Sequence, residues 1–260
     1  MITPSSVPGR RTLRLLLPTL ALALATAAAA VAADCPCPPA APPPPPLWTG
    51  SLGFSYLATS GNTDSSSLGL TGTAARQPTP WGLEVSALAN RAESDGEETA
   101  ERLFGSFKAR RAVGEAFELF GGLIWERDRF AGFDSRALVS LGGTWKPLRG
   151  PAHELSFDGG LTWTEEDPVV GDDDGYAGAL LGGTWVWHFT ATASLREKAL
   201  FFPSFSDSTN WRATSDTALE AALASAWALR VGYFYSRDNL PAAGFGKSDA
   251  TTSVSLVWKR

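Results

Sequence analysis

The sequence predicts an all-β protein, a transmembrane antiparallel up-and-down β-barrel of about twelve strands. Three observations predict it. From residue 48 onward, apolar and polar residues alternate with the period of two that is typical of strands with unlike faces. The connections between these segments alternate between short turns and longer polar loops. No apolar run after the N-terminal segment is long enough for a membrane helix, so any spanning must be done by strands.

Residues 1–33 are predicted to be a signal peptide that is absent from the mature protein. Arg10, Arg11 and Arg14 form a basic start, residues 15–32 form an apolar core, and small residues precede Asp34. An uncleaved membrane anchor is the alternative interpretation of this segment. Removing these residues removes three arginines and no acid, which lowers the formal charge from −5 to −8. An acidic mature chain lacks the basic footprint of a nucleic-acid-binding protein.

Residues 34–47 are predicted to be an extended periplasmic linker, because the run from 38 to 46 is almost entirely proline and alanine. Cys35 and Cys37 lie together at its start and are the two cysteines of the chain. Two adjacent cysteines make neither a disulfide framework nor a zinc site. A lipid-modified Cys35 stays open as an alternative, and the role of the pair is not indicated by the sequence.

Residues 48–260 are predicted to form the barrel. The clearest strand is 153–164, where Leu155, Phe157, Leu161 and Trp163 share one face and polar residues the other. The expected strands, each near the ten residues that a tilted strand needs to cross a bilayer, are 48–58, 66–76, 81–93, 100–113, 117–127, 135–146, 153–165, 176–187, 192–203, 210–223, 227–237 and 248–259.

Two kinds of connection alternate between these strands. The short ones are expected at 77–80, 114–116, 147–152, 188–191 and 224–226. The longer ones, polar and mostly acidic, are expected at 60–64, 94–99, 128–134, 166–175, 204–209 and 239–247. Short periplasmic turns and longer extracellular loops are the arrangement of bacterial outer-membrane barrels.

The placement of aromatic and charged residues predicts that the apolar face meets lipid. Aromatic residues recur near strand ends on the apolar face, at Trp48, Tyr56, Trp81, Trp125, Trp145, Trp163, Trp185, Trp187, Trp211, Trp227 and Trp258. Charges inside the strands fall mostly on the polar face, at Glu84, Arg102, Lys108, Arg110, Arg136, Asp158, Lys198, Arg212, Asp216, Glu220 and Arg230. A cation at mid-depth on the lipid face costs roughly 2–4 kcal/mol, which explains this segregation.

Two segments fit the pattern less simply. Glu197 falls on the apolar face, which predicts a β-bulge or a shifted strand boundary there. Residues 217–229 are rich in alanine and leucine and have helical propensity, but their neighbours alternate. We expect strand in this segment, because a helix would leave an odd number of strands.

Several motifs carry a resemblance to a known family. They are Trp48-Thr49-Gly50, Ser60-Gly61-Asn62-Thr63, the segment 127–132, paired glycines at 142–143 and 159–160, and a closing strand after Asp249. Together they resemble the YdiY-like salt-induced outer-membrane proteins, a domain family of unknown function, over residues 48 to 260. The resemblance implies an outer-membrane barrel and carries over no catalytic residue. The chain departs from the usual aromatic last residue of such barrels, because Trp258 is followed by Lys259 and Arg260.

The sequence predicts no catalytic, cofactor-binding or metal-ligating residue, and no cofactor. The histidines are His153 and His188, both expected near short turns. Ser156 is interpreted as sharing a face with His153, but no third group orients this pair for nucleophilic catalysis. The six carboxylates at 165–167 and 172–174 are expected in one outer loop. A solvated acidic loop is favoured over a calcium or magnesium site there, because no ligand spacing is defined.

The predicted function is therefore a non-enzymatic outer-membrane barrel, either a narrow passive pore or a structural barrel. Lumen charges of both signs argue against strong ion selectivity, since single-sign rings impose it. A barrel-embedded lipid hydrolase and a soluble periplasmic β-barrel that binds an apolar ligand are the alternatives. The expected partners are outer-membrane lipid, lipopolysaccharide and, during biogenesis, the barrel-assembly machinery. We expect a monomer and no binding of nucleic acid.

Overall fold

Twelve long strands make up the folded part of the chain. The computed structural model describes residues 47–59, 65–78 and 80–259. The strands are β1 (Trp48–Thr59), β2 (Ser65–Arg76), β3 (Trp81–Ser94), β4 (Glu97–Ala112), β5 (Phe117–Asp128), β6 (Phe133–Arg149), β7 (His153–Pro168), β8 (Asp174–His188), β9 (Ala193–Pro203), β10 (Trp211–Ala224), β11 (Trp227–Asp238) and β12 (Ser248–Lys259). The predicted signal peptide, the predicted linker up to residue 46 with both cysteines, and the predicted loop 60–64 with its Ser-Gly-Asn-Thr motif lie outside the described residues.

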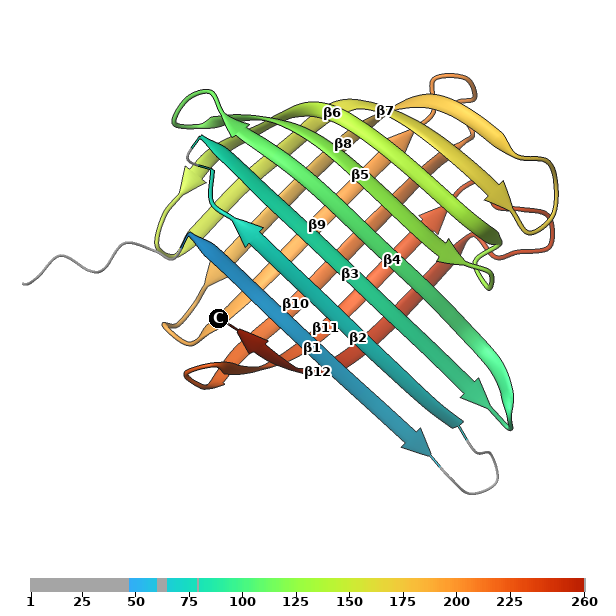
Figure 1. Ribbon diagram of the computed structural model, residues 1–260, viewed down its shortest axis with the longest axis horizontal. Coiled ribbons are helices and arrows are strands. Elements are labelled where there is room, and N and C mark those ends of the chain that lie inside the picture. Colours follow the sequence, from blue (N-terminus) through green and yellow to red (C-terminus); the bar gives the residue numbers. More distant parts are fainter. Residues whose placement is uncertain (1–46, 60–64, 79, 260) are drawn as a thin grey trace, which may run out of the picture. The chain divides into compact units, whose positions relative to one another are not determined.

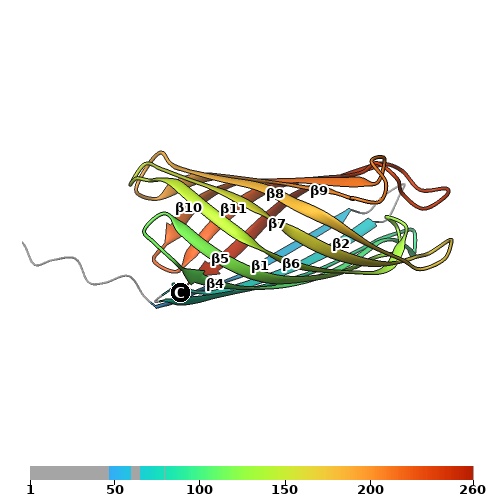
Figure 2. The same ribbon diagram turned by 90° about the horizontal axis from the view of Figure 1, so that it is seen from above.

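The strands close into an antiparallel up-and-down barrel, as predicted. Each strand pairs with the next in the sequence, and β1 pairs with β12 to complete the ring. That closing contact runs from Ser51 opposite Lys259 to Phe54 opposite Leu256. The strands run obliquely around the wall, as Figures 1 and 2 show. The described residues contain no helix, and hence none that is long and apolar enough to cross a bilayer.

The two ends of the barrel differ, and two predicted connections are wrong. At the short-turn end lie the starts of β1, β3, β5, β7, β9 and β11. At the loop end lie the connections that follow these six strands. The longer loop expected at 94–99 is a two-residue turn, in which Asp95 and Gly96 both have positive φ (52° and 80°). An Asp-Gly pair suits such a hairpin turn, so β3 and β4 are longer than expected. Residues 147–149 likewise extend β6, which leaves a turn of three residues before β7.

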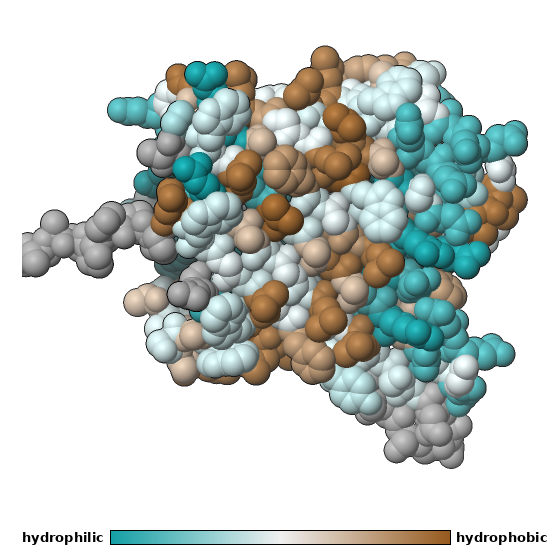
Figure 3. Space-filling model, in the orientation of Figure 1, coloured by the Kyte–Doolittle hydropathy of each residue, from teal (hydrophilic) through white to brown (hydrophobic). Residues whose placement is uncertain are grey.

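The outer face of the barrel is apolar, which confirms the predicted orientation. Leu52, Leu141, Leu161 and Val254 are between 58% and 68% exposed, although each lies inside a strand. The strand residues that alternate with these point into the barrel. They include buried charged and polar side chains such as Arg136, Thr144 and Thr162. In Figure 3, hydrophobic residues cover the middle of the visible face and hydrophilic residues gather at the loop end. An exterior of this kind needs a lipid surround, so the barrel spans a membrane.

Aromatic side chains gather near both ends of this apolar exterior. Towards the short-turn end, Phe117 stacks on Trp145 with ring centroids 6.4 Å apart, and Trp185 stacks on Trp187 at 6.2 Å. Near the loop end, Trp163 is 50% exposed on the same outer parity. These positions agree with the predicted interfacial girdles, where amphipathic rings prefer to lie.

Paired glycines bring β6 and β7 close together on the lumen side. Gly142 lies opposite Gly160 in the register. A Cβ at Gly142 would press against the backbone of Gly159 and Gly160 and against the Phe120 ring. The glycines that helped to predict the family therefore provide room for Phe120 inside the barrel.

Glu197 lies on the outer face of β9 without a bulge, so that prediction is wrong. Its strand stays in unbroken register with both neighbours, since Glu197 lies opposite Trp185 on one side and Thr217 on the other. The carboxylate accepts hydrogen bonds from the hydroxyls of Ser215, at 2.7 Å, and Thr217. Two hydroxyl donors replace part of the hydration that a carboxylate loses on this face. The segment 217–229 is strand, as predicted, and forms parts of β10 and β11.

Candidate functional site

Paired charges of both signs line the lumen of the barrel. The side chains predicted on the polar face reach one another in pairs across neighbouring or distant strands. Glu118, Glu126 and Asp238 also take part, and these three were not singled out from the sequence. Glu166, which was expected in an outer loop, takes part as well. The alternation of β5 would have indicated Glu118 and Glu126, since they share the parity of Phe120. The interior is therefore charged, which excludes the soluble barrel with an apolar binding cavity.

Arg136 on β6 is the centre of an ion-pair network near the loop end. Its Nε and Nη2 donate to the two carboxylate oxygens of Glu166, at 2.8 and 2.7 Å. Nη2 also donates to Asp238 at 3.0 Å, and Nη1 donates to Glu126 at 3.3 Å. The guanidinium lies over the Phe133 ring, 4.0 Å from its centroid, and the side chain is 7% exposed. A buried arginine with three carboxylates holds β5, β6, β7 and β11 in fixed positions.

The network crosses the lumen and joins opposite walls. Arg136 on β6 reaches Asp238 on β11, which is five strands away around the ring. Arg212 on β10 donates to Glu126 on β5 at 3.4 Å. Arg102 on β4 lies over the ring of Phe234 on β11, with its Cζ 4.4 Å from the centroid. Because these side chains from opposite walls contact one another, they narrow the lumen at the level of Arg136.

A second group of charges lies closer to the short-turn end, and several of its ion pairs are more open to solvent, although Glu118 is buried there. Lys108 contacts Asp158 at 3.0 Å, and the two side chains are 26% and 16% exposed. Arg110 contacts Glu84 at 3.2 Å, with 20% and 32% exposed. Arg230 near Asp216, at 3.5 Å, is similar. Solvent therefore reaches charged groups inside the barrel on this side of the constriction.

The histidines do not form the catalytic pair considered from the sequence. His153 lies on the outer face, stacked against Trp185 and Trp187 with centroids 5.9 Å away in both cases. Ser156 is three residues along the same strand, so it faces the lumen, and the interpretation that the two share a face is wrong. His188 contacts Glu154 at 3.3 Å at the exposed short-turn end. Neither histidine is arranged as a base beside Ser156.

The six clustered carboxylates do not form one outer loop as expected. Glu165, Glu166 and Asp167 belong to β7, and Asp174 begins β8. Glu166 faces the lumen and is bound to Arg136. Among the described residues, no group of three acidic, histidine or cysteine side chains is placed to hold a metal ion. In the loop between β9 and β10, hydrogen bonds from the backbone and hydroxyl of Thr209 lower the pKa of Asp207.

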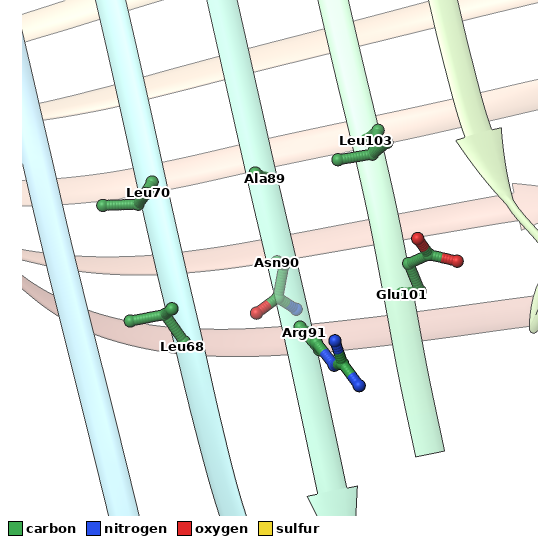
Figure 4. A pocket seen from close by; sticks show the side chains of 7 residues that line it. All are labelled: Leu68, Leu70, Ala89, Asn90, Arg91, Glu101 and Leu103. Atoms are coloured by element: carbon green, nitrogen blue, oxygen red, sulfur yellow. The ribbon is translucent and has the colours of Figure 1, made fainter. Parts of the chain in front are cut away.

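A shallow hollow lies in the wall near the loop end, where β2, β3 and β4 run side by side (Figure 4). Its apolar floor comes from leucines and an alanine, and Arg91 is 61% exposed at its edge. Arg91 is already paired with Glu93 at 2.8 Å and Glu98 at 3.6 Å. The lining residues are Leu68, Leu70, Ala89, Asn90, Arg91, Glu101 and Leu103. Leu68 and Leu70 in its lining are 41% and 49% exposed on the lipid-facing parity, so the hollow opens on the outer surface.

Comparison with solved structures finds other barrels. The NanC porin aligns with a TM-score of 0.49 and 10% identity, over 82% of this chain and 99% of that one. The COG4313 outer membrane channel from Pseudomonas putida F1 aligns with a TM-score of 0.47 and 15% identity, over 82% and 94%. The translocator domain of the autotransporter NalP from Neisseria meningitidis aligns at 0.44 and 15%, over 81% and 87%.

Comparison of sequences finds one family. The model of the family described as "Protein of unknown function, DUF481" matches residues 52–259. The uncharacterized protein YdiY of Escherichia coli strain K12 is 27% identical over 210 residues, covering 80% of this chain and 81% of YdiY. These matches confirm the resemblance to YdiY-like proteins that the motifs between residues 48 and 260 indicated.

Proposed function

We propose that this chain, which belongs to the DUF481 family, is a non-enzymatic barrel of the bacterial outer membrane and a narrow passive pore for small ions. The observation that carries the proposal is the charged lumen, in which several ion pairs outside the Arg136 network are partly exposed to solvent. At the constriction the side chains of Arg136 and Arg212 are 7% and 10% exposed, whereas Arg230 and Asp216 are 29% and 33% exposed. Water and small ions reach the network, and movement of its side chains controls passage.

Three features support the outer membrane as the location. The exterior is apolar with aromatic residues near both ends, and the twelve strands put both barrel termini at the short-turn end. With residues 1–33 as a cleaved signal and 34–47 as a linker, the short-turn end faces the periplasm. The barrel is then a monomer in contact with lipid and lipopolysaccharide, inserted by the barrel-assembly machinery. A link to salt stress rests on family resemblance and would appear as a salt-dependent protein level.

A passive role fits the arrangement of the reactive side chains better than catalysis does. His153 is stacked against Trp185 and Trp187 on the lipid side, and His188 pairs with Glu154 at an exposed edge. A lipid hydrolase requires a nucleophile, a base and an orienting group in mutual contact. Alanine at His153 and at His188 is therefore expected to leave phospholipid hydrolysis at the background level of protein-free vesicles.

The test is conductance of the purified protein in a planar lipid bilayer, with heat-modifiable gel mobility as the check that the barrel is folded. We expect discrete current steps. A folded barrel without current would instead support a closed structural barrel, which the cross-lumen contact between Arg136 and Asp238 favours as the second candidate. Recovery of the protein in a detergent-free soluble fraction would contradict both.

A further inference from the structure

Two arginines of the lumen network use their hydrogen-bond donors differently. In a guanidinium, Nε and Nη2 lie on one edge and form a fork that matches the two oxygens of a carboxylate. The fork of Arg136 is filled by Glu166, at 2.8 and 2.7 Å. The fork of Arg212 is buried, and neither Nε nor Nη2 has an acceptor among the described residues. Arg212 is held by the remaining nitrogen, Nη1, at 3.4 Å from Glu126.

The carboxylates of the network are unevenly shared. Arg136 forms ion pairs with Glu166 and Asp238 and contacts one oxygen of Glu126. Arg212 contacts that same oxygen, and Arg102 lies 3.6 Å from the other one. The Nε of Arg102 is also buried and has no acceptor within the described part of the chain. Arg102 and Arg212 therefore share Glu126 with Arg136, which leaves buried N–H donors of both arginines without an acceptor among the described residues.

We propose that Arg212, assisted by Arg102, is a binding site for the carboxylate group of a small solute in the lumen. The Glu166–Arg136 pair of the same network is the geometric template for the contact. Aromatic rings flank the site, since the Cζ of Arg212 lies 5.5 Å from the Phe202 centroid and that of Arg102 lies 4.4 Å from Phe234. These rings exclude water around the guanidiniums and suit a solute with a short apolar part beside its carboxylate.

Entry of the solute adds an ion pair without breaking one. The solute carboxylate takes the fork of Arg212 with two hydrogen bonds, while Nη1 keeps its 3.4 Å contact with Glu126. Glu126 keeps its contacts with Arg136 and Arg102, so no carboxylate of the network is left without a cation. The inference names a solute class for the proposed pore and rests on that proposal for the route into the lumen.

The experiment measures acetate binding to the protein expressed from the full chain and purified in detergent micelles, by saturation-transfer NMR on the acetate methyl signal. We expect saturable binding of acetate and no binding of acetamide, its neutral isostere. Arg212→Gln should weaken acetate binding at least about tenfold, since it removes the fork and the charge. Arg212→Lys should weaken it similarly, because lysine keeps the charge but lacks the fork. Heat-modifiable mobility checks that each variant is folded.

The control is Arg237→Gln, an arginine of β11 whose guanidinium lies near Trp211, 5.7 Å from its ring centroid. It should bind acetate like the unmodified protein. Unchanged acetate affinity in both Arg212 variants, or equal binding of acetate and acetamide, would overturn the proposal. The binding experiment does not depend on the conductance experiment. A folded barrel that binds acetate through Arg212 but gives no current would refute only the proposed pore. A barrel that gives current but binds acetate equally well without Arg212 would refute only the proposed solute site.

Discussion

Replacing Arg136 by glutamine tests how much the lumen network stabilises the barrel. The arginine side chain is 7% exposed, and its partners Glu126, Glu166 and Asp238 are 14%, 18% and 22% exposed. At these exposures solvent screens little, so removing the cation leaves buried carboxylates without compensation. Breaking a buried pair in this way costs about 3–5 kcal/mol. We expect the free energy of unfolding of Arg136→Gln to fall by that amount at neutral pH.

The assay is equilibrium urea unfolding in lipid vesicles, followed by the fluorescence of the ten tryptophans. The control is Arg91→Gln, which removes an ion pair of similar length from a side chain that is 61% exposed, and it should cost less than about 1 kcal/mol. Acidification protonates the uncompensated carboxylates, so the difference between Arg136→Gln and the unmodified protein should narrow as pH falls. Equal losses for the two variants at neutral pH would refute the account of the buried network.

Three further substitutions are tested by the same unfolding measurement. Gly142→Ala should lower the free energy of unfolding by about 1–3 kcal/mol, because the added Cβ meets backbone atoms. Gly159→Ala, with open space around its Cβ, should lower it much less, and equal losses for the two variants would contradict this account. Leu161→Arg, on the lipid face and 65% exposed, should lower the free energy of unfolding by about 2–4 kcal/mol. Phe205→Arg, in a loop, should leave it nearly unchanged. A Leu161→Arg variant as stable as the unmodified protein would contradict the assignment of this face to lipid. Glu197→Gln should be neutral or stabilising, because the charge is removed, the amide oxygen still accepts from one hydroxyl and the amide N–H can donate to the oxygen of the other. A loss of more than about 2 kcal/mol in the free energy of unfolding would show that the charge itself is required.

The strands and the two faces of the barrel could be predicted from the sequence because both follow from a local period of two. Leu161 and Thr162 illustrate it, since one is 65% exposed to lipid and the other is buried in the lumen. The same rule contradicts the interpretation that His153 and Ser156 share a face, because they are three residues apart and therefore face opposite sides. The turn at Asp95 and Gly96 was also predictable, because an Asp-Gly pair between alternating segments indicates a two-residue hairpin.

The lumen network could not be predicted in the same way. Alternation assigns Arg136 and Asp238 to the inner face, but their contact joins strands that are five apart around the ring. Which strands face each other depends on the number and stagger of all strands together, and this is a property of the closed barrel. Glu197 is a different case, because its position on the outer face was read correctly. The hydroxyls of Ser215 and Thr217 that stabilise it there come from a neighbouring strand.

The most direct test of the constricted pore compares single-channel currents of Arg136→Gln and the unmodified protein across a salt gradient. Loss of the arginine opens the contact between the β6 and β11 walls and leaves Glu126, Glu166 and Asp238 without their shared cation. We predict larger current steps and a reversal potential shifted towards cation preference in the folded variant. Identical step size and reversal potential in the two folded proteins would contradict the claim that this network controls the lumen.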